Sequence, residues 1–152
     1  MQYRKGYFVD TLQNFLNKTF KGSKTRKLLN LTSPLKHGGT IPKGTLVIMA
    51  SGDAKLRLKI LEKDTPHKGF SIPLILNSEA HDLDISPNYL HWYLSHKVIQ
   101  DQLMMQAIGS VFLRVPKKII DSIPVPIPTN SSRKQSVKEV VIKRKDDSFR
   151  EL

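Results

Sequence analysis

The chain of 152 residues is long enough for one domain with a hydrophobic core, and an apolar content of 39% does not indicate disorder throughout. No apolar run approaches the ~20 residues that span a bilayer, and the first residues lack the pattern of a signal peptide, so we expect no membrane association. There are no cysteines, which excludes disulfides and thiolate metal ligands and fits a cytoplasmic location.

The net charge of +12 comes from 25 Lys and Arg residues against 13 Asp and Glu residues. Such an excess attracts polyanions, of which nucleic acid is the commonest. The charge is uneven, because residues 1–37 carry eight basic residues and one acid, whereas residues 38–128 carry ten against eight. We expect one domain over residues 1–128 and a basic tail over residues 129–152, with a short strand at 137–142 as an alternative for part of the tail.

The first element is expected over residues 11–18. Apolar side chains at Phe8, Leu12, Phe15, Leu16 and Phe20 are spaced close to one helical face, and Asp10 could cap the helix. A strand over residues 6–9 is the competing interpretation. The basic segment 21–27 contains Gly and Ser and has no apolar residue, so it predicts an exposed loop.

Three strands are expected in the middle of the chain. Residues 46–50 are a short apolar run typical of a buried strand, and residues 55–61 alternate between apolar and basic side chains as a half-buried strand does. Residues 70–76 form the third strand, with an edge or bulge at Pro73. Loops or turns at 33–39 and 41–44 precede the first strand, and a turn at 51–53 and a loop at 65–69 separate the three strands.

A long helix should follow, from Ser86 to about Gln106. Ser86 is a good N-cap and Pro87 suits the first helical position, while Trp92 and Tyr93 lie on or beside the apolar face and should pack in the core or an interface. A helical turn is expected at 116–121. Alternate prolines over residues 123–128 predict an edge strand or a polyproline-like extension across the core. The fold class is therefore α+β: a small, twisted, mixed or antiparallel sheet with a packed helix at about 86–106.

Two groups of cations are candidates for phosphate contacts. The first is a cluster without balancing acids, and the second lies at alternate positions of the strand over 55–61, so its side chains share one face. A solvated loop is the alternative for the first group, and protection of a sheet edge is the alternative for the second. The first group comprises Lys18, Lys21, Lys24, Arg26 and Lys27, and the second comprises Lys55, Arg57 and Lys59.

The order of motifs from about residue 41 to residue 128 resembles the target recognition domain of type I restriction-modification specificity subunits. The resemblance lies in a turn leading into a strand at 41–48, the Pro-x-Tyr-Leu pattern of Pro87 to Leu90, the Gly109-Ser110 turn, and the closing Ile-Pro-x-Pro of residues 123–126. Thr45 stands where Asp is usual in that family. The spacer helix that follows each such domain in the family has no counterpart after Pro128.

The resemblance implies a double-stranded DNA recognition module that directs a methyltransferase or nuclease partner. It places Ser110 and Arg114 near the recognition face, where Arg114 could pair with a guanine edge or, alternatively, with Asp121. Loops commonly carry recognition residues, so base or phosphate contacts are also expected from Lys36, His37, His67 and Lys68. The absent spacer leaves assembly open between a half-subunit that forms a homodimer, a free-standing module, and a domain recruited to another system.

No catalytic pattern stands out. Glu79, His81, Asp82 and Asp84 form one acid/His cluster, which could bind a divalent ion but is better explained as negative charge before the helix that starts at Ser86. His91 and His96 are five residues apart, which does not suggest a metal pair. There is no phosphate-binding loop, cofactor turn or methyltransferase motif.

We expect a protein that is not an enzyme and has no cofactor. The alternatives are a non-specific basic nucleic-acid-binding protein and a decoy or anti-restriction module that binds a protein.

Overall fold

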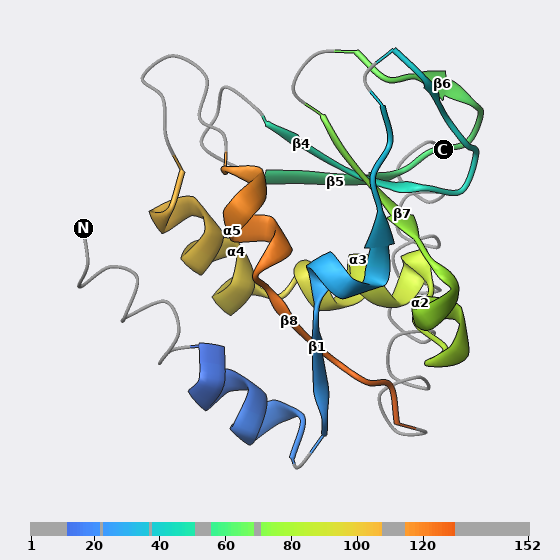
Figure 1. Cartoon of the computed structure of the whole chain (residues 1–152). Helices are drawn as coiled ribbons and strands as arrows, with labels where there is room; N and C mark the ends of the chain where they lie inside the picture. Colours follow the sequence, from blue (N-terminus) through green and yellow to red (C-terminus); the bar gives the residue numbers. More distant parts are fainter. Residues whose placement is uncertain are drawn as a thin grey trace, which may run out of the picture.

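The computed structural model describes residues 12–21, 23–36, 38–50, 56–68, 71–107 and 115–129. They form an α+β fold in which antiparallel strands and short helices enclose one main core (Figure 1). The first helix covers residues 12–19. The labelled elements are β1 (Thr25–Lys27), the 3-10 helix η1 (Leu28–Leu31), β2 (Thr32–Ser33), β3 (Thr40–Ile41), β4 (Leu46–Ala50), β5 (Leu56–Ile60), β6 (Thr65–Pro66), β7 (Ile72–Leu76), α2 (Ser78–Asp82), α3 (Pro87–Leu94), α4 (Lys97–Met105), α5 (Lys117–Asp121) and β8 (Pro124–Pro126).

The largest sheet has the strand order β2-β7-β4-β5, and each neighbouring pair is antiparallel. The three strands predicted from the sequence are its members β4, β5 and β7. Pro73 pairs with Val47 of β4, whereas β2 reaches only Ile75 and Leu76 of β7. Beside Pro73 the strand therefore has one open side, which confirms the expected edge, since a residue without an amide hydrogen is tolerated there.

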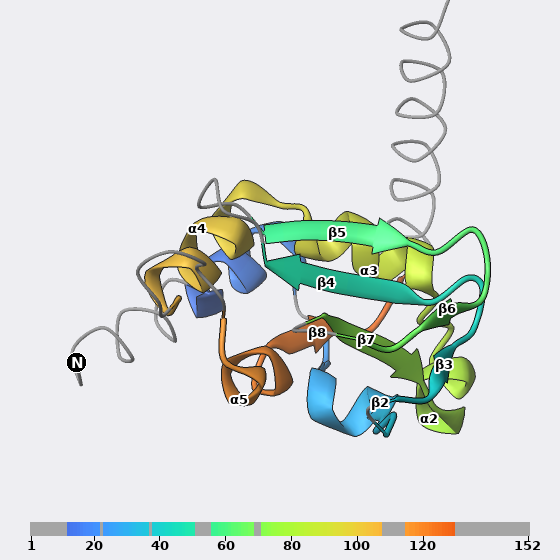
Figure 2. The same cartoon turned by 90° about the horizontal axis from the view of Figure 1, so that it is seen from above.

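One face of this sheet packs against helix α3. Leu46, Ile48 and Leu74 are buried in the main core, and alternate residues of β5 pack against it. Both views place α3 on the same side of β4 and β5 (Figures 1 and 2). Trp92 and Tyr93 of α3 are also buried, which confirms that these aromatic residues serve packing.

The first helix adds its apolar stripe to the same core. Leu12, Leu16 and Phe20 are buried, as the helical spacing predicts. The ring of Phe20 meets that of Trp92 edge-to-face at a centroid distance of 5.8 Å, and it contacts Tyr93 in the same way at 5.6 Å. The predicted helix is thus confirmed from residue 12 onward. Its expected cap Asp10, the alternative strand at 6–9 and the tail after Thr129 lie outside the described residues.

The single long helix expected over 86–106 is wrong, because the chain forms two helices, α3 and α4. The start is as predicted: Ser86 Oγ accepts from the amide of Tyr89 at 3.1 Å, and Pro87 follows it. The break comes at His96, which has an extended conformation with φ −61° and ψ 137°. Gln100 Nε2 donates to the carbonyl of Leu94 at 2.8 Å, so a side chain replaces one of the lost helical hydrogen bonds.

The expected loop over 21–27 is wrong in its second half, because residues 25–27 form strand β1. It pairs with β8 in antiparallel register, Thr25 opposite Pro126 and Lys27 opposite Pro124. The predicted proline-punctuated strand is therefore confirmed. Further bonds extend the pairing, from the amide of Ile127 to the carbonyl of Lys24 at 2.8 Å and from the amide of Leu28 to the carbonyl of Ile123 at 2.9 Å.

Two tyrosines of α3 hold the prolines of β8. Tyr89 Oη donates to the carbonyl of Pro126 at 2.6 Å, and Tyr93 Oη donates to the carbonyl of Pro124 at 2.5 Å. In a strand, the nitrogen and the carbonyl of one residue point to the same side. The prolines thus turn their donor-less side toward α3, where hydroxyl groups can donate and no amide is required. This explains how a strand with alternate prolines is held between β1 and α3.

The acidic segment before α3 also differs from expectation. It forms a helix of its own, α2, capped by Asn77, whose Oδ1 accepts from the amide of Ala80 at 3.1 Å. The first turn of α3 contains no acidic residue. The expectation that this segment supplies negative charge to the first turn of α3 is therefore wrong. Asp84 forms the turn between the two helices with a positive φ of 59°, a conformation that Asp adopts more readily than most residues.

Candidate nucleic-acid interface

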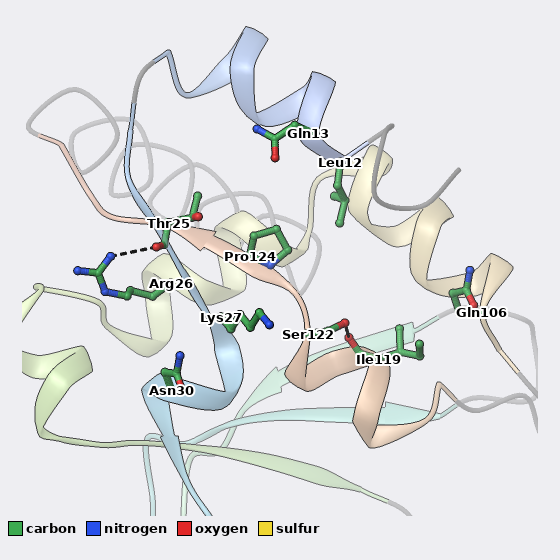
Figure 3. A pocket seen from close by; sticks show the side chains of 10 residues that line it. All are labelled: Leu12, Gln13, Thr25, Arg26, Lys27, Asn30, Gln106, Ile119, Ser122 and Pro124. Atoms are coloured by element: carbon green, nitrogen blue, oxygen red, sulfur yellow. Dashed lines mark hydrogen bonds between the residues drawn. The ribbon is translucent and has the colours of Figure 1, made fainter. Parts of the chain in front are cut away.

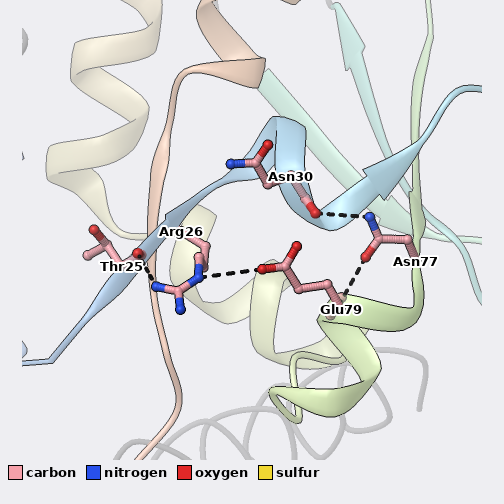
Figure 4. Close-up of polar contacts among 6 residues, drawn as sticks. Thr25, Arg26, Asn30, Asn77 and Glu79 are labelled. Atoms are coloured by element: carbon pink, nitrogen blue, oxygen red, sulfur yellow. Dashed lines mark hydrogen bonds and ion pairs between the residues drawn. The ribbon is translucent and has the colours of Figure 1, made fainter.

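The N-terminal cations gather around strand β1 and the end of the first helix. Lys21, Lys24 and Lys27 are exposed, and no described carboxylate forms an ion pair with them. Arg26 behaves differently, because its Nε lies 3.5 Å from Glu79 Oε1 and its Nη1 donates to the carbonyl of Thr25 at 3.0 Å (Figure 4). The guanidinium group of Arg26 therefore links β1 to α2, whereas the three lysines present their charge to solvent.

A hollow of about 630 Å³ lies beside β1, between the first helix and the segment from α5 to β8 (Figure 3). Leu12, Ile119 and Pro124 supply apolar lining, and the polar lining includes Gln13, Lys27 and Asn30. A second hollow of about 390 Å³ shares the lining residues Gln13, Thr25 and Arg26 with the first. We call the two together the β1 groove.

The lining of the β1 groove carries hydrogen-bonding groups and positive charge. Gln13 Nε2 donates to Asn17 Oδ1 at 3.1 Å, so two amide side chains on the first helix are linked. Asn30 lies on η1, and the carbonyl of Asn30 accepts from Asn77 Nδ2 at 2.9 Å, which ties this part of the wall to α2 (Figure 4). None of the described residues that line the groove is acidic. The groove therefore combines a largely apolar lining with hydrogen-bonding side chains and lysines, and it has no described acidic residue that would repel an anionic ligand.

Sequence reasoning found the lysines of this groove but missed Gln13, Asn30 and Ser122. Nothing in the local sequence distinguishes Asn30 and Ser122 from other exposed polar residues. They meet because β1 pairs with a strand about 100 residues later in the chain. The hydrophobic spacing of the first helix was the one usable signal, since it fixes Gln13 on the flank of the buried stripe.

The second predicted group lies on the outer face of β5. Arg57 and Lys59 are exposed, and Leu58 and Ile60, which alternate with them along the strand, pack against the core as the alternating pattern predicts. Lys55 lies outside the described residues. Because β5 is the last strand of the sheet order, its basic face is also consistent with edge protection.

The predicted recognition loops around Lys36 and Lys68 lie next to each other. The amide of His67 donates to the carbonyl of Gly39 at 2.8 Å, and the amide of Gly38 donates to the carbonyl of His67 at 3.2 Å. Lys36 and Lys68 are exposed, but the side chain of His67 is buried, and its Nε2 lies 3.2 Å from the carbonyl of Ser71. In this conformation His67 supports the loop from inside. His37, Ser110 and Arg114 lie outside the described residues.

Other site chemistry is sparse in the part of the chain that the structure describes. No group of three or more His, Cys, Asp or Glu residues there is arranged to hold a metal ion. Asp121, the alternative partner considered for Arg114, forms an ion pair with Lys117 at 2.8 Å.

Burial, with a smaller effect from Tyr89, raises the pKa of Tyr93 far above its usual value of 10.0, so this hydroxyl stays a hydrogen-bond donor. Among the described residues no helix has the length and apolar character needed to cross a membrane.

No protein-family model matches the sequence. No curated protein matches it either. The fold does match a solved structure, the S subunit of the type I restriction-modification system from M. genitalium, with a TM-score of 0.62 and 12% sequence identity. The match covers 86% of this chain and 42% of that chain, so this chain spans less than half of the subunit it resembles. At this identity the likeness shows the fold: the chain has the α+β architecture of part of a type I restriction-modification S subunit.

Proposed function

We propose that this chain is a double-stranded DNA recognition module of the type I specificity-subunit kind, which directs a DNA methyltransferase or nuclease partner and performs no chemistry itself. The observation that carries the proposal is the shared fold with an S subunit over 86% of the chain. The net charge of +12 also supports the proposal, because binding to DNA phosphates requires positive charge.

The surface chemistry is consistent with this function. Exposed lysines attract phosphates and release counterions from DNA, and such contacts position a protein on the duplex without reading its sequence. We assign phosphate contacts to the exposed cations at the N-terminal cluster, on β5 and in the paired loops. These are Lys21, Lys24, Lys27, Lys36, Arg57, Lys59 and Lys68.

The direct experiment is selection of bound sequences from a randomised duplex pool at ~150 mM salt, where binding through phosphates alone is already weak. A recognition module enriches a short motif, and its affinity for that motif exceeds its affinity for random duplex by roughly 10³-fold or more. Equal affinity for all duplexes, with binding that vanishes as salt rises, would establish a non-specific basic protein instead. Because S subunits act within assemblies, the selection is run with the chain alone and with a candidate methyltransferase subunit.

The contribution of β5 is tested by replacing Arg57 and Lys59 together with alanine. A plot of log affinity against log salt has a negative slope, and each lost phosphate contact makes it shallower by about 0.9. If both side chains contact DNA, the slope of the variant is therefore shallower by about 2. The affinity for all sequences decreases to the same extent. An unchanged slope would assign this face to protection of the sheet edge.

A further inference from the structure

We propose that the β1 groove is the sequence-reading part of the interface: it takes one sugar–phosphate strand of the duplex, with Lys24 and Lys27 on phosphates and Gln13 and Asn30 on base edges. This inference rests on the proposed DNA-binding function and goes further by naming the reading residues.

Charge is the first argument for DNA as the occupant. Lys24 and Lys27 line the groove, and no described carboxylate neutralises them. Lys21 follows the first helix, is exposed, and adds positive charge shortly before β1 in the chain. The nearest acid that β1 does contact, Glu79, is already paired with Arg26, whose guanidinium group is directed toward α2 (Figure 4). Lys24 and Lys27 therefore give the groove a positive charge that no described carboxylate balances.

Hydrogen-bonding capacity is the second argument. A carboxamide side chain offers a donor and an acceptor side by side, which matches the edge of adenine in the major groove. Gln13 and Asn30 project from different walls of the groove, one from the first helix and one from η1 (Figure 3). Two amides on separate walls can contact base edges next to one backbone strand.

The walls that carry these amides are firmly held, which base reading requires. Leu12 and Leu16, on either side of Gln13, are buried in the core. Asn30 lies between the fully buried Leu28 and Leu31 in the sequence, and its carbonyl accepts a hydrogen bond from Asn77. The two reading side chains are themselves exposed, so they can be exchanged without opening the core.

The outer face of β5 lacks this combination. Along β5, Lys59 is paired in register with Val47 and Arg57 with Met49, so its cations stand beside apolar residues. The described residues of this face can contact phosphates, but none of them is a carboxamide that could read a base edge. The groove unites both kinds of contact, which favours it as the reading site.

The test compares four single alanine variants of the full chain with two matched controls. Gln13→Ala and Asn30→Ala remove the proposed base contacts, and Lys24→Ala and Lys27→Ala remove the proposed phosphate contacts. Asn88→Ala and Lys63→Ala are the controls, because both residues are exposed and lie outside the lining of the groove. Each variant is taken through the duplex selection and a salt titration on the best motif, after its melting temperature has been compared with that of the parent chain.

We expect each amide variant to relax one position of the motif, with a loss of discrimination of roughly 5- to 150-fold there and little change at the other positions. We expect each lysine variant to leave the motif unchanged, to weaken binding to all duplexes alike, and to lower the salt slope by about 1. The two controls should match the parent chain in all three measurements.

The inference is overturned if the parent chain enriches a motif and all four groove variants retain both that motif and the parental salt slope. That outcome would leave the proposed function standing and move the reading site elsewhere. A parent chain that binds duplexes without any motif, or fails to bind with and without its methyltransferase, overturns the proposed function together with this inference. Loss of motif in the Asn88→Ala control would show that the effect is not specific to the groove.

Discussion

The two tyrosine hydroxyls that hold β8 permit a sharp test of how the proline strand is stabilised. Replacing Tyr93 or Tyr89 by phenylalanine keeps the ring and removes the donor to Pro124 or Pro126. A hydrogen bond of this kind contributes ~1 kcal/mol net, and leaving a buried carbonyl unsatisfied costs ~1–3 kcal/mol. Both members of the Tyr89–Pro126 pair are buried, whereas Pro124 is partly exposed, so water can reach its carbonyl once the donor is gone.

We therefore expect Tyr89→Phe to lower the free energy of unfolding by about 2–3 kcal/mol and Tyr93→Phe by about 1–2 kcal/mol. For a domain of this size each kcal/mol corresponds to roughly 3–5 °C in melting temperature. Chemical denaturation followed by circular dichroism measures both values. If both variants remain within about 0.5 kcal/mol of the parent chain, the range of an ordinary surface substitution, the carbonyls of β8 do not depend on these donors.

The pH dependence of stability provides an independent check on Tyr93. Its pKa is raised in the folded protein by burial and, to a smaller extent, by Tyr89. Above pH 10 the unfolded chain loses the Tyr93 proton while the folded protein keeps it, so the unfolded state binds fewer protons and the free energy of unfolding falls as pH rises. The contribution is fully present below pH 10 and declines by up to about 1.4 kcal/mol per pH unit above it. Tyr93→Phe should show a shallower decline, and identical slopes for the two proteins would contradict the assignment.

Two further substitutions test local features of the fold. Asn77→Asp keeps a good N-cap for α2, but it removes the donor to the carbonyl of Asn30 and places a carboxylate next to that carbonyl. We therefore expect the free energy of unfolding, measured by chemical denaturation, to fall by about 1–2 kcal/mol. A stability equal to that of the parent chain would show that this link is dispensable. Gly44 has φ +87°, and there is open space where a Cβ would stand. Gly44→Ala should therefore lower the free energy of unfolding by about 1–2 kcal/mol through backbone strain alone. A higher melting temperature for this variant than for the parent chain would mean that the turn adopts another conformation.

Local sequence signals predicted the elements whose geometry depends on neighbours in the chain. Ser86 followed by Pro87 marked the start of α3, and the alternation around Arg57 and Lys59 marked β5, because capping and strand alternation act within a few residues. The break at His96 escaped prediction because no Gly or Pro marks it. It is stabilised instead by a side chain from the next helix, Gln100.

For the candidate interface, too, the sequence predicted the features that depend on neighbouring residues and missed the contacts between distant ones. Charge alone pointed to Lys21, Lys24 and Lys27, since a cluster without acids is visible in any window of the sequence. The same count could not reveal that Arg26 is engaged by Glu79, a residue more than fifty positions later in the chain. It also could not show that Gln13 and Asn30 share a groove with those lysines.

The sequence by itself determined the α+β class, the strands β4, β5 and β7 and the positive charge. These properties follow from composition, periodicity and turn residues, which can be recognised in short stretches of neighbouring positions. Tertiary structure alone decided that a polar tripeptide becomes β1 and that a strand with alternate prolines can pair with it. Both outcomes need partners distant in sequence: β8 supplies the pairing, and the hydroxyls of Tyr89 and Tyr93 supply donors where the prolines have no amide hydrogen.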